Sequence, residues 1–210
     1  MAIEDEQFMN AIKKLRETEV KRKFPQTVDL IVNLKNFDSK KDAFNVLLEL
    51  PHPYKNKKVA GFFEKDSSVI DTITKDDFPR YKEKKDIRKL VKHYDFFIAN
   101  ARLMPAIATS FGRTLGPAGK MPSPQLGVIL TEDEKTIKEI SKKINCTIRI
   151  RAKEPSVKVG VAKDSLKDEE ILKNVLAVYR KIIDTLPRKK DQVRNVLIKL
   201  TMDKPIKVEI

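Results

Sequence analysis

The sequence contains no tryptophan, a single cysteine and only two histidines among its 210 residues. Cys146 has no second cysteine with which to form an internal disulfide. With only His52 and His93 beside it, the chain also lacks a cluster of thiolate and imidazole ligands at metal-binding spacing. We therefore expect no disulfide, no structural metal and no cofactor.

Long apolar runs are also missing, since no stretch approaches the roughly 18 residues that a membrane-spanning helix requires. The first ten residues, MAIEDEQFMN, are acidic where a signal peptide would be basic and then apolar. Hydrophobic residues make up 40% of the chain and charged residues 35%. This composition is typical of a soluble globular protein, so we expect a cytoplasmic location and no membrane partner.

Acidic residues are too few to balance the basic ones, because 30 Asp and Glu face 44 Lys and Arg, for a net charge of +14. A field of that sign attracts polyanions, so nucleic acid is the first expected partner. The alternative is that the lysines only keep the protein soluble. The position of the basic residues should distinguish the two.

Catalytic motifs are scarce. His52 lies between two prolines, and neither it nor His93 accompanies a Ser or Cys in a nucleophile motif. Glu132, Asp133 and Glu134 stand together before a predicted helix, where acidic side chains simply favour the helix dipole. No catalytic residue is predicted from these patterns.

One segment does look like a phosphate-binding loop, the glycine-rich stretch GRTLGPAGKMPSP at residues 112–124. A Walker A loop needs a glycine five residues before the Gly-Lys pair and a Ser or Thr after it. Thr114 and Met121 occupy those positions around Lys120, so the motif fails.

The same glycines also fail the dinucleotide fingerprint, which needs spacings of i, i+2 and i+5. Gly112, Gly116 and Gly119 fall at i, i+4 and i+7. Three interpretations stay open: a structural turn, a nucleic-acid contact through Lys120, or a small-molecule site. The last of these would make the chain a small nucleotide-binding enzyme that uses residues 112–120.

Hydrophobic periodicity divides the rest of the chain into helices and strands. Helices are expected at residues 4–18, 86–94, 103–111, 131–144 and 168–186, the fourth opening with a capping box of Thr131 and Glu134. Strands are expected at residues 27–34, 44–50, 59–63, 95–99, 147–151 and 156–161, and two more in residues 193–210 around a turn at Asp203 and Lys204. Residues 147–161 are expected to form a hairpin.

The elements alternate between strand and helix in the middle of the chain, and neither flank alone has enough elements for a core. We therefore expect a discontinuous domain of residues 1–60 plus 148–210, with residues 61–147 inserted. By that division the terminal domain carries +10 of the +14, so it is the expected polyanion-binding part.

Two basic clusters fall in this terminal domain. Arg149, Arg151 and Lys153 alternate along one strand face, with Lys158 and Lys163 downstream, which indicates either a nucleic-acid contact or a solvated strand face.

In the second cluster, KRKF at residues 21–24, Phe24 follows Lys23. An aromatic ring there could stack on a base or belong to the core.

Several stretches together resemble the universal L1 family of large-subunit ribosomal proteins, which belongs to the lateral stalk, in its archaeal form. They keep the family's order and spacing over nearly the whole chain: KFPQTVDLIVNLK (23–35), LELPHP (48–53), DFFIA (95–99), GRTLGPAGKMPSP (112–124) and KLTMDKPIKVEI (199–210).

The resemblance implies an α+β terminal domain that binds RNA and an inserted, Rossmann-like α/β domain of three layers. It also implies an rRNA-binding site made of three segments: Lys23, Phe24, Thr27 and Asp29; Lys153, Glu154 and Lys163; and Thr201, Met202 and Asp203. Asp203 replaces the family's usual glycine, so that contact is expected to be altered or compensated by Lys204.

The resemblance further implies a function without catalysis: binding stalk rRNA in the large subunit, assisting release of tRNA from the E site, and repressing translation of its own mRNA. Off the ribosome a monomer is expected. Gly116, Gly119 and Lys120 become candidate contacts to tRNA or to the other domain.

Overall fold

The structure is a computed structural model that describes residues 3–18, 20, 22–81 and 83–209. Its internal contacts divide the chain into a terminal unit, Met1–Lys55 with Cys146–Ile210, and an inserted unit, Asn56–Asn145. Within the described ranges, no helix is both long enough and apolar enough to cross a membrane.

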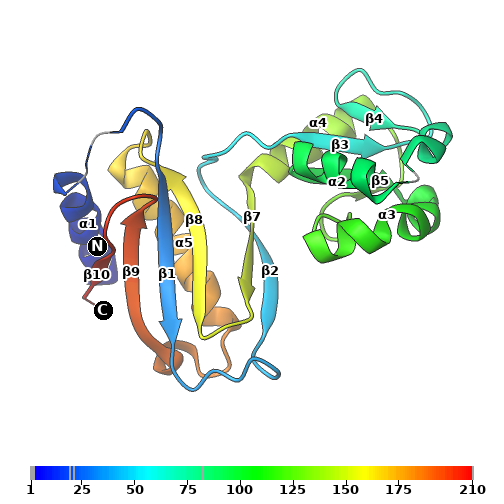
Figure 1. The fold of residues 1–210 in the computed structure, drawn as a ribbon. Helices are drawn as coiled ribbons and strands as arrows, with labels where there is room; N and C mark the ends of the chain where they lie inside the picture. Colours follow the sequence, from blue (N-terminus) through cyan, green and yellow to red (C-terminus); the bar gives the residue numbers. More distant parts are fainter. Residues whose placement is uncertain (1–2, 19, 21, 82, 210) are drawn as a thin grey trace. The chain divides into compact units, whose positions relative to one another are not determined.

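An antiparallel sheet forms the centre of the terminal unit (Figure 1). Its strands lie in the order β10 (Ile206–Val208), β9 (Val193–Leu200), β1 (Thr27–Leu34) and β8 (Ser156–Lys163). Residues along β1 alternate between buried and half-buried, with Val28, Leu30 and Val32 in the core. This alternation confirms the strand expected at residues 27–34 and places every second side chain on the opposite face.

Two helices, α1 (Ile3–Glu17) and α5 (Asp168–Thr185), cover one face of this sheet. The apolar stripe of α5 packs onto the buried side chains of β1 and β8, and Phe8 of α1 meets Tyr179 of α5 edge to face at 5.2 Å. Thr27, Asp29, Ile31 and Asn33 of β1 alternate with its core residues and therefore lie on the opposite face, which we call the open face.

A separate antiparallel ladder of β2 (Phe44–Glu49) and β7 (Thr147–Ala152) leads out to the inserted unit and back. Ile148 and Ile150 of β7 are buried in the core of the terminal unit. The expected hairpin of residues 147–161 is wrong, because β7 pairs with β2 while β8 pairs with β1. Local alternation predicted both strands, whereas their pairing partners are set by residues about a hundred positions away.

The inserted unit is a three-layer α/β structure around a parallel sheet, which confirms the expected fold class. The strand order is β4 (Asp71–Ile73), β3 (Val59–Phe62), β5 (Phe96–Asn100) and β6 (Val128–Ile129). The apolar clusters assign α2 (Lys84–His93) and α3 (Met104–Ala118) to one side of the sheet and α4 (Glu134–Cys146) to the other. In the part of the chain that the structure describes, short 3₁₀ helices complete the elements: η1 (Lys75–Tyr81) and η2 (Ala101–Leu103) here, and η3 (Lys189–Gln192) in the terminal unit.

The glycine-rich segment is largely helical rather than a loop from residue 112. Helix α3 continues through Gly112 and Gly116 and ends where Gly119 adopts φ 66° and ψ 25°. Each interior glycine costs only about 1 kcal/mol. Burial of Phe111 and Leu115 against the sheet offsets that cost, so the predicted helix end at residue 111 is wrong.

The capping box predicted for residues 131–134 is also wrong, because α4 begins at Glu134 itself. The Glu134 carboxylate instead accepts a 2.7 Å hydrogen bond from the Ser68 hydroxyl and pairs with Lys138. Contacts with Ser68 and Lys138 therefore take the place of the predicted capping box.

The unit boundary also changes the distribution of charge, because Lys57 and Lys58 fall in the inserted unit. The terminal unit holds 26 basic and 18 acidic residues, or +8, and the inserted unit holds 18 and 12, or +6. These charges are in proportion to the lengths of 120 and 90 residues. With these bounds, net charge does not favour the terminal unit over the inserted unit as the polyanion-binding part.

Candidate nucleic-acid interface

Parts of the three predicted segments meet at one end of the terminal sheet, the upper end in Figure 1. Thr27 at the start of β1 lies opposite Lys163 at the end of β8. The Thr201 hydroxyl, just after β9, accepts a 3.0 Å hydrogen bond from the Thr27 N–H and donates to the Thr27 carbonyl at 3.3 Å. We call this region, residues 22–27, 163–164 and 201–204, the sheet end.

Gln26 connects these segments, although the sequence did not single it out. Its N–H donates to the Asp164 carboxylate at 2.8 Å, and its carbonyl accepts from the Asp164 N–H at 3.0 Å. Its side-chain oxygen accepts from the Met202 N–H at 3.2 Å. The side chain is only 1% exposed, so the turn carrying Met202 is held by a buried amide. No local pattern marks Gln26, because all its partners are distant in sequence.

Large apolar side chains are exposed at this sheet end. Phe24 is 48% exposed and Met202 61% exposed, which places Phe24 at the surface rather than in the core. Among the described residues the other exposed large hydrophobic side chains are Val20, shortly before Phe24, and Leu130 of the inserted unit. The sheet end is therefore a candidate for apolar contact with a partner.

Asp203 follows Met202 without needing a glycine's conformational freedom. The described non-glycine residues with positive φ are Asn36 and Lys189, so Asp203 has an ordinary φ. One of its carboxylate oxygens, Oδ2, is buried without a hydrogen-bond partner and therefore points into the protein. The turn thus accommodates Asp203 with an ordinary backbone conformation and directs part of its carboxylate inward.

Asp29 lies on the open face beside the sheet end, opposite Gly160 of β8 and Lys199 of β9. A Cβ on Gly160 would come within 3.3 Å of both the Asp29 carboxylate and the Tyr54 hydroxyl, so a glycine allows these groups to converge. Burial raises the pKa of Asp29, and Lys199 offsets part of that rise. Burial, and then the Asp29 charge, raises the pKa of Tyr54.

The structure does not bring Lys153 and Glu154 to the sheet end. They precede β8, whose first residue, Ser156, pairs with Asn33 at the far end of β1. Six residues of strand separate Asn33 from Thr27, or about 20 Å at the usual rise per residue. Glu154 instead lines a cavity of about 290 Å³ with Arg194 and Asn195. The ten predicted residues therefore form two groups.

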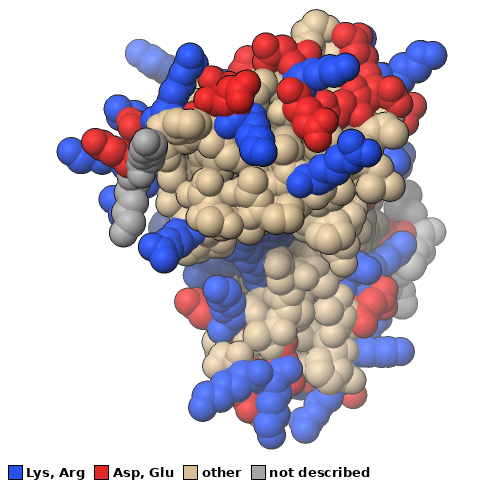
Figure 2. All heavy atoms as spheres, turned by 90° about the vertical axis from the view of Figure 1, so that its right-hand side faces the viewer, with Lys and Arg blue, Asp and Glu red and all other residues tan. Residues whose placement is uncertain are grey.

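Basic side chains on the sheets lie between and beside these groups. Lys158 of β8 is exposed, in register with Ile31 on the open face, and Arg151 of β7 is exposed as well. Burial, followed by repulsion from Arg151, lowers the pKa of Arg149. On the face drawn in Figure 2, Lys and Arg are scattered rather than gathered into one patch.

Lys120 has partners within the inserted unit. Its ammonium donates to the carbonyls of Val91 and Tyr94 at 2.6 and 2.7 Å, at the end of α2. Its N–H donates to Leu115, and the Gly119 N–H donates to Gly116, which together form the Schellman ending of α3. These bonds give Gly119 and Lys120 a structural role.

Comparison with known proteins identifies the family. The model described as the ribosomal protein L1p/L10e family matches residues 14–203. The chain belongs to this family. It is therefore a ribosomal protein, found with the ribosome in the cytoplasm, and a structural component rather than an enzyme. Family membership overturns the alternative of a nucleotide-binding enzyme built on residues 112–120.

Archaeal proteins named large ribosomal subunit protein uL1 are similar to this L1-family chain over its whole length. The protein of Pyrobaculum calidifontis is 35% identical, covering 99% of this chain and 95% of the relative. Those of Pyrococcus horikoshii and Thermococcus kodakarensis are 34% and 35% identical, covering 100% of this chain and 98% and 100% of the relatives.

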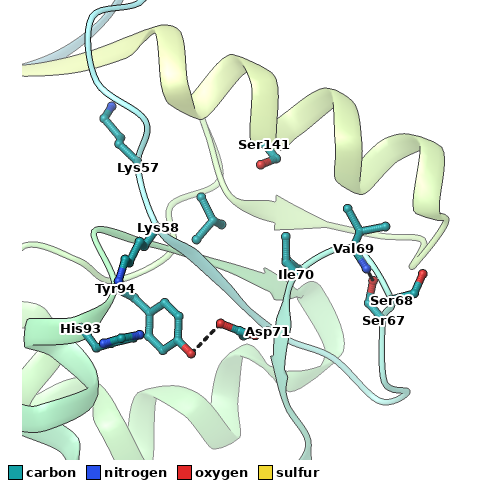
Figure 3. A pocket seen from close by; sticks show the side chains of 11 residues that line it. Lys57, Lys58, Ser67, Ser68, Val69, Ile70, Asp71, His93, Tyr94 and Ser141 are labelled. Carbon is teal, nitrogen blue, oxygen red and sulfur yellow. Dashed lines mark hydrogen bonds between the residues drawn. The ribbon is translucent and has the colours of Figure 1, made fainter.

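The inserted unit of this family member also has an open cavity of about 490 Å³, shown in Figure 3. It lies beside the first residues of β3 and β4, among Lys58, His93 and Tyr94. The Tyr94 hydroxyl donates to Asp71 at 2.8 Å, and burial together with this bond raises the pKa of Tyr94 to about 12. The sequence did not predict this cavity, because its residues come from four separate segments.

Proposed function

We propose that this chain is a structural constituent of the large ribosomal subunit and that its sheet end binds the stalk region of the large-subunit rRNA. The observation that carries the proposal is the exposure of Phe24 and Met202 on backbone that Thr27 and Gln26 hold in place. The names of the archaeal relatives support the assignment to the large subunit.

The chemistry of this surface suits RNA with an irregular fold. Phe24 and Met202 offer apolar faces on which unstacked bases can pack. Lys23 and Lys163 lie beside them and can neutralise phosphates, which fixes the register of the RNA without reading its sequence. Because hydrogen bonds to Thr27 and Gln26 hold the turn in place, little conformational entropy is lost on binding.

Lys153 and Glu154 make a second contact in this proposal, about 20 Å along the sheet by the usual rise per residue. Asp29 and Lys158 on the open face lie between the two contacts. A partner that reaches both contacts must be a folded RNA that spans at least that distance. A single nucleotide is too short to do so. The proposed specificity is therefore for RNA shape.

We extend the proposal to two further ligands of the family. The chain's own mRNA would bind at the sheet end by presenting the same RNA shape, which represses its translation. The inserted unit, with a net charge of +6, would contact E-site tRNA and assist its release. Off the ribosome the chain acts as a monomer.

Filter binding to an isolated stalk rRNA fragment tests the main proposal. Phe24→Ala and Met202→Ala should each weaken binding about tenfold, because a base loses its apolar contact. Leu130→Ala is the matched control, since Leu130 is 84% exposed but lies in the inserted unit. Unchanged affinity in both sheet-end variants, or an equal loss in the control, would remove the sheet end as the rRNA site.

A further inference from the structure

The parallel sheet of the inserted unit has a topological switch point. The strand order β4-β3-β5-β6 reverses between β3 and β5, since the chain moves outward from β3 to β4 and from β5 to β6. In doubly wound sheets, ligands with phosphate groups bind in the crevice at the carboxyl ends of the two strands beside that reversal. Here those ends are Phe62 and Asn100.

A carboxylate of the chain itself occupies this place. One oxygen of Glu132 accepts hydrogen bonds from the Glu64 N–H at 2.9 Å and from the Asn100 amide at 2.6 Å. Its other oxygen accepts from the Lys65 N–H at 3.3 Å. Three N–H donors from the ends of both strands therefore converge on a single anionic group.

Other contacts hold part of this set of donors in place. Asn100 is only 4% exposed, and its side-chain oxygen accepts from the Arg102 N–H at 3.0 Å, which turns the amide nitrogen toward Glu132. Glu64 and Lys65 come after Phe63, the residue that follows β3, and Phe63 is fully buried in the core, so the position of their N–H groups is tied to the sheet. Convergent N–H groups of this kind bind oxyanions.

We propose that the switch point of the inserted unit is an oxyanion site for which Glu132 serves as the built-in ligand. Its chemical class is the tetrahedral oxyanion, phosphate or sulfate, with three oxygens able to accept from Glu64, Lys65 and Asn100. While Glu132 is bound, the site admits neither a free anion nor the phosphate of a nucleotide. Removal of the carboxylate opens it.

Thermal unfolding of the full chain tests this proposal in sodium phosphate, sodium sulfate and sodium chloride at equal ionic strength. Glu132→Ala should melt below the wild type in chloride. In phosphate its Tm should rise by about 3–5 °C for each tenfold increase above the dissociation constant. The wild type should show only the smaller stabilisation that phosphate gives through its exclusion from protein surfaces.

Two variants separate this site from general salt effects. Glu134→Ala removes a neighbouring acid that bonds to Ser68 instead, so it should gain no phosphate response. Adding Asn100→Ala to Glu132→Ala removes a donor and should weaken the phosphate response at least tenfold in concentration. Equal phosphate responses in Glu132→Ala, Glu134→Ala and the wild type would overturn the proposal.

Should Glu132→Ala fail to fold, Glu132→Gln serves in its place, because it keeps the volume and one acceptor oxygen. Its amide N–H groups face the donors of the site, so the Gln side chain binds there more weakly than the Glu132 carboxylate does. Phosphate should therefore displace it, at a higher concentration than Glu132→Ala requires. Absence of any phosphate-specific shift in this variant also contradicts the built-in ligand.

Discussion

The proposed rRNA site depends strongly on one side chain, the hydroxyl of Thr201. It both accepts from and donates to the Thr27 backbone, so it ties the turn of Met202 to β1. Thr201→Ala should lower the free energy of unfolding by about 1 kcal/mol and weaken binding of the stalk rRNA fragment about tenfold.

Thr109→Ala is the control for this prediction, because the Thr109 hydroxyl also bonds a backbone carbonyl, that of Pro105, but within the inserted unit. Its rRNA affinity should equal that of the wild type in the same filter-binding assay. If Thr201→Ala binds as tightly as Thr109→Ala, the turn has no part in the interface.

Asp29 gives a prediction about pH. Because burial raises its pKa above 3.8 in the folded protein, the ionised form costs stability at neutral pH, and this cost disappears as pH falls through the folded pKa. Asp29→Asn should therefore raise the free energy of unfolding at pH 7, by less than about 1 kcal/mol since the side chain keeps contact with solvent.

Urea unfolding at pH 7 and near pH 3 measures this difference. The advantage of Asp29→Asn should vanish at the lower pH, where the carboxyl of the wild type is protonated in both states. A variant less stable than the wild type at pH 7 would show that attraction to Lys199 outweighs burial.

At the scale of elements, helix α3 predicts opposite effects for two glycines. Gly119 ends the helix with φ 66°, so Gly119→Ala should lower the free energy of unfolding by about 1 kcal/mol. Gly112 lies inside the helix with nothing within 4 Å of an added Cβ, so Gly112→Ala should raise it by about 0.5–1 kcal/mol. Thermal unfolding of the two variants would refute the assigned helix end if both shifts had the same sign.

The division of the chain into two units predicts that the terminal unit folds and binds the rRNA without the inserted unit. Glu49 and Thr147 pair across the β2–β7 ladder, and the Leu50 N–H donates to Cys146, so the chain leaves and returns at adjacent positions. Replacing residues 56–145 by a short glycine-serine linker should leave a cooperative unfolding transition and an rRNA affinity within about threefold.

Circular dichroism and filter binding of the deletion variant check this expectation. A folded variant that loses more than tenfold in affinity would place part of the rRNA contact in the inserted unit. Both units have the same net charge per residue, so charge alone does not predict which unit contacts the rRNA.

Apolar spacing alone predicts the helices and strands whose buried side chains recur with the period of their secondary structure. The alternation along residues 27–34 and the stripe of residues 168–186 each define a buried face, because side-chain direction follows from local geometry. The family motifs likewise pointed to the fold class and to most of the candidate residues.

Long-range contacts in the folded chain bring particular candidate residues together and keep others apart. They join Thr27 to Thr201 across 174 positions, add Gln26, and separate Lys153 and Glu154 from the sheet end. Phe24 is exposed at the surface, and the Lys120 ammonium donates to a carbonyl at the end of α2. Periodicity specifies the face on which a side chain lies, whereas strand pairing and hydrogen-bond partners depend on contacts between distant segments.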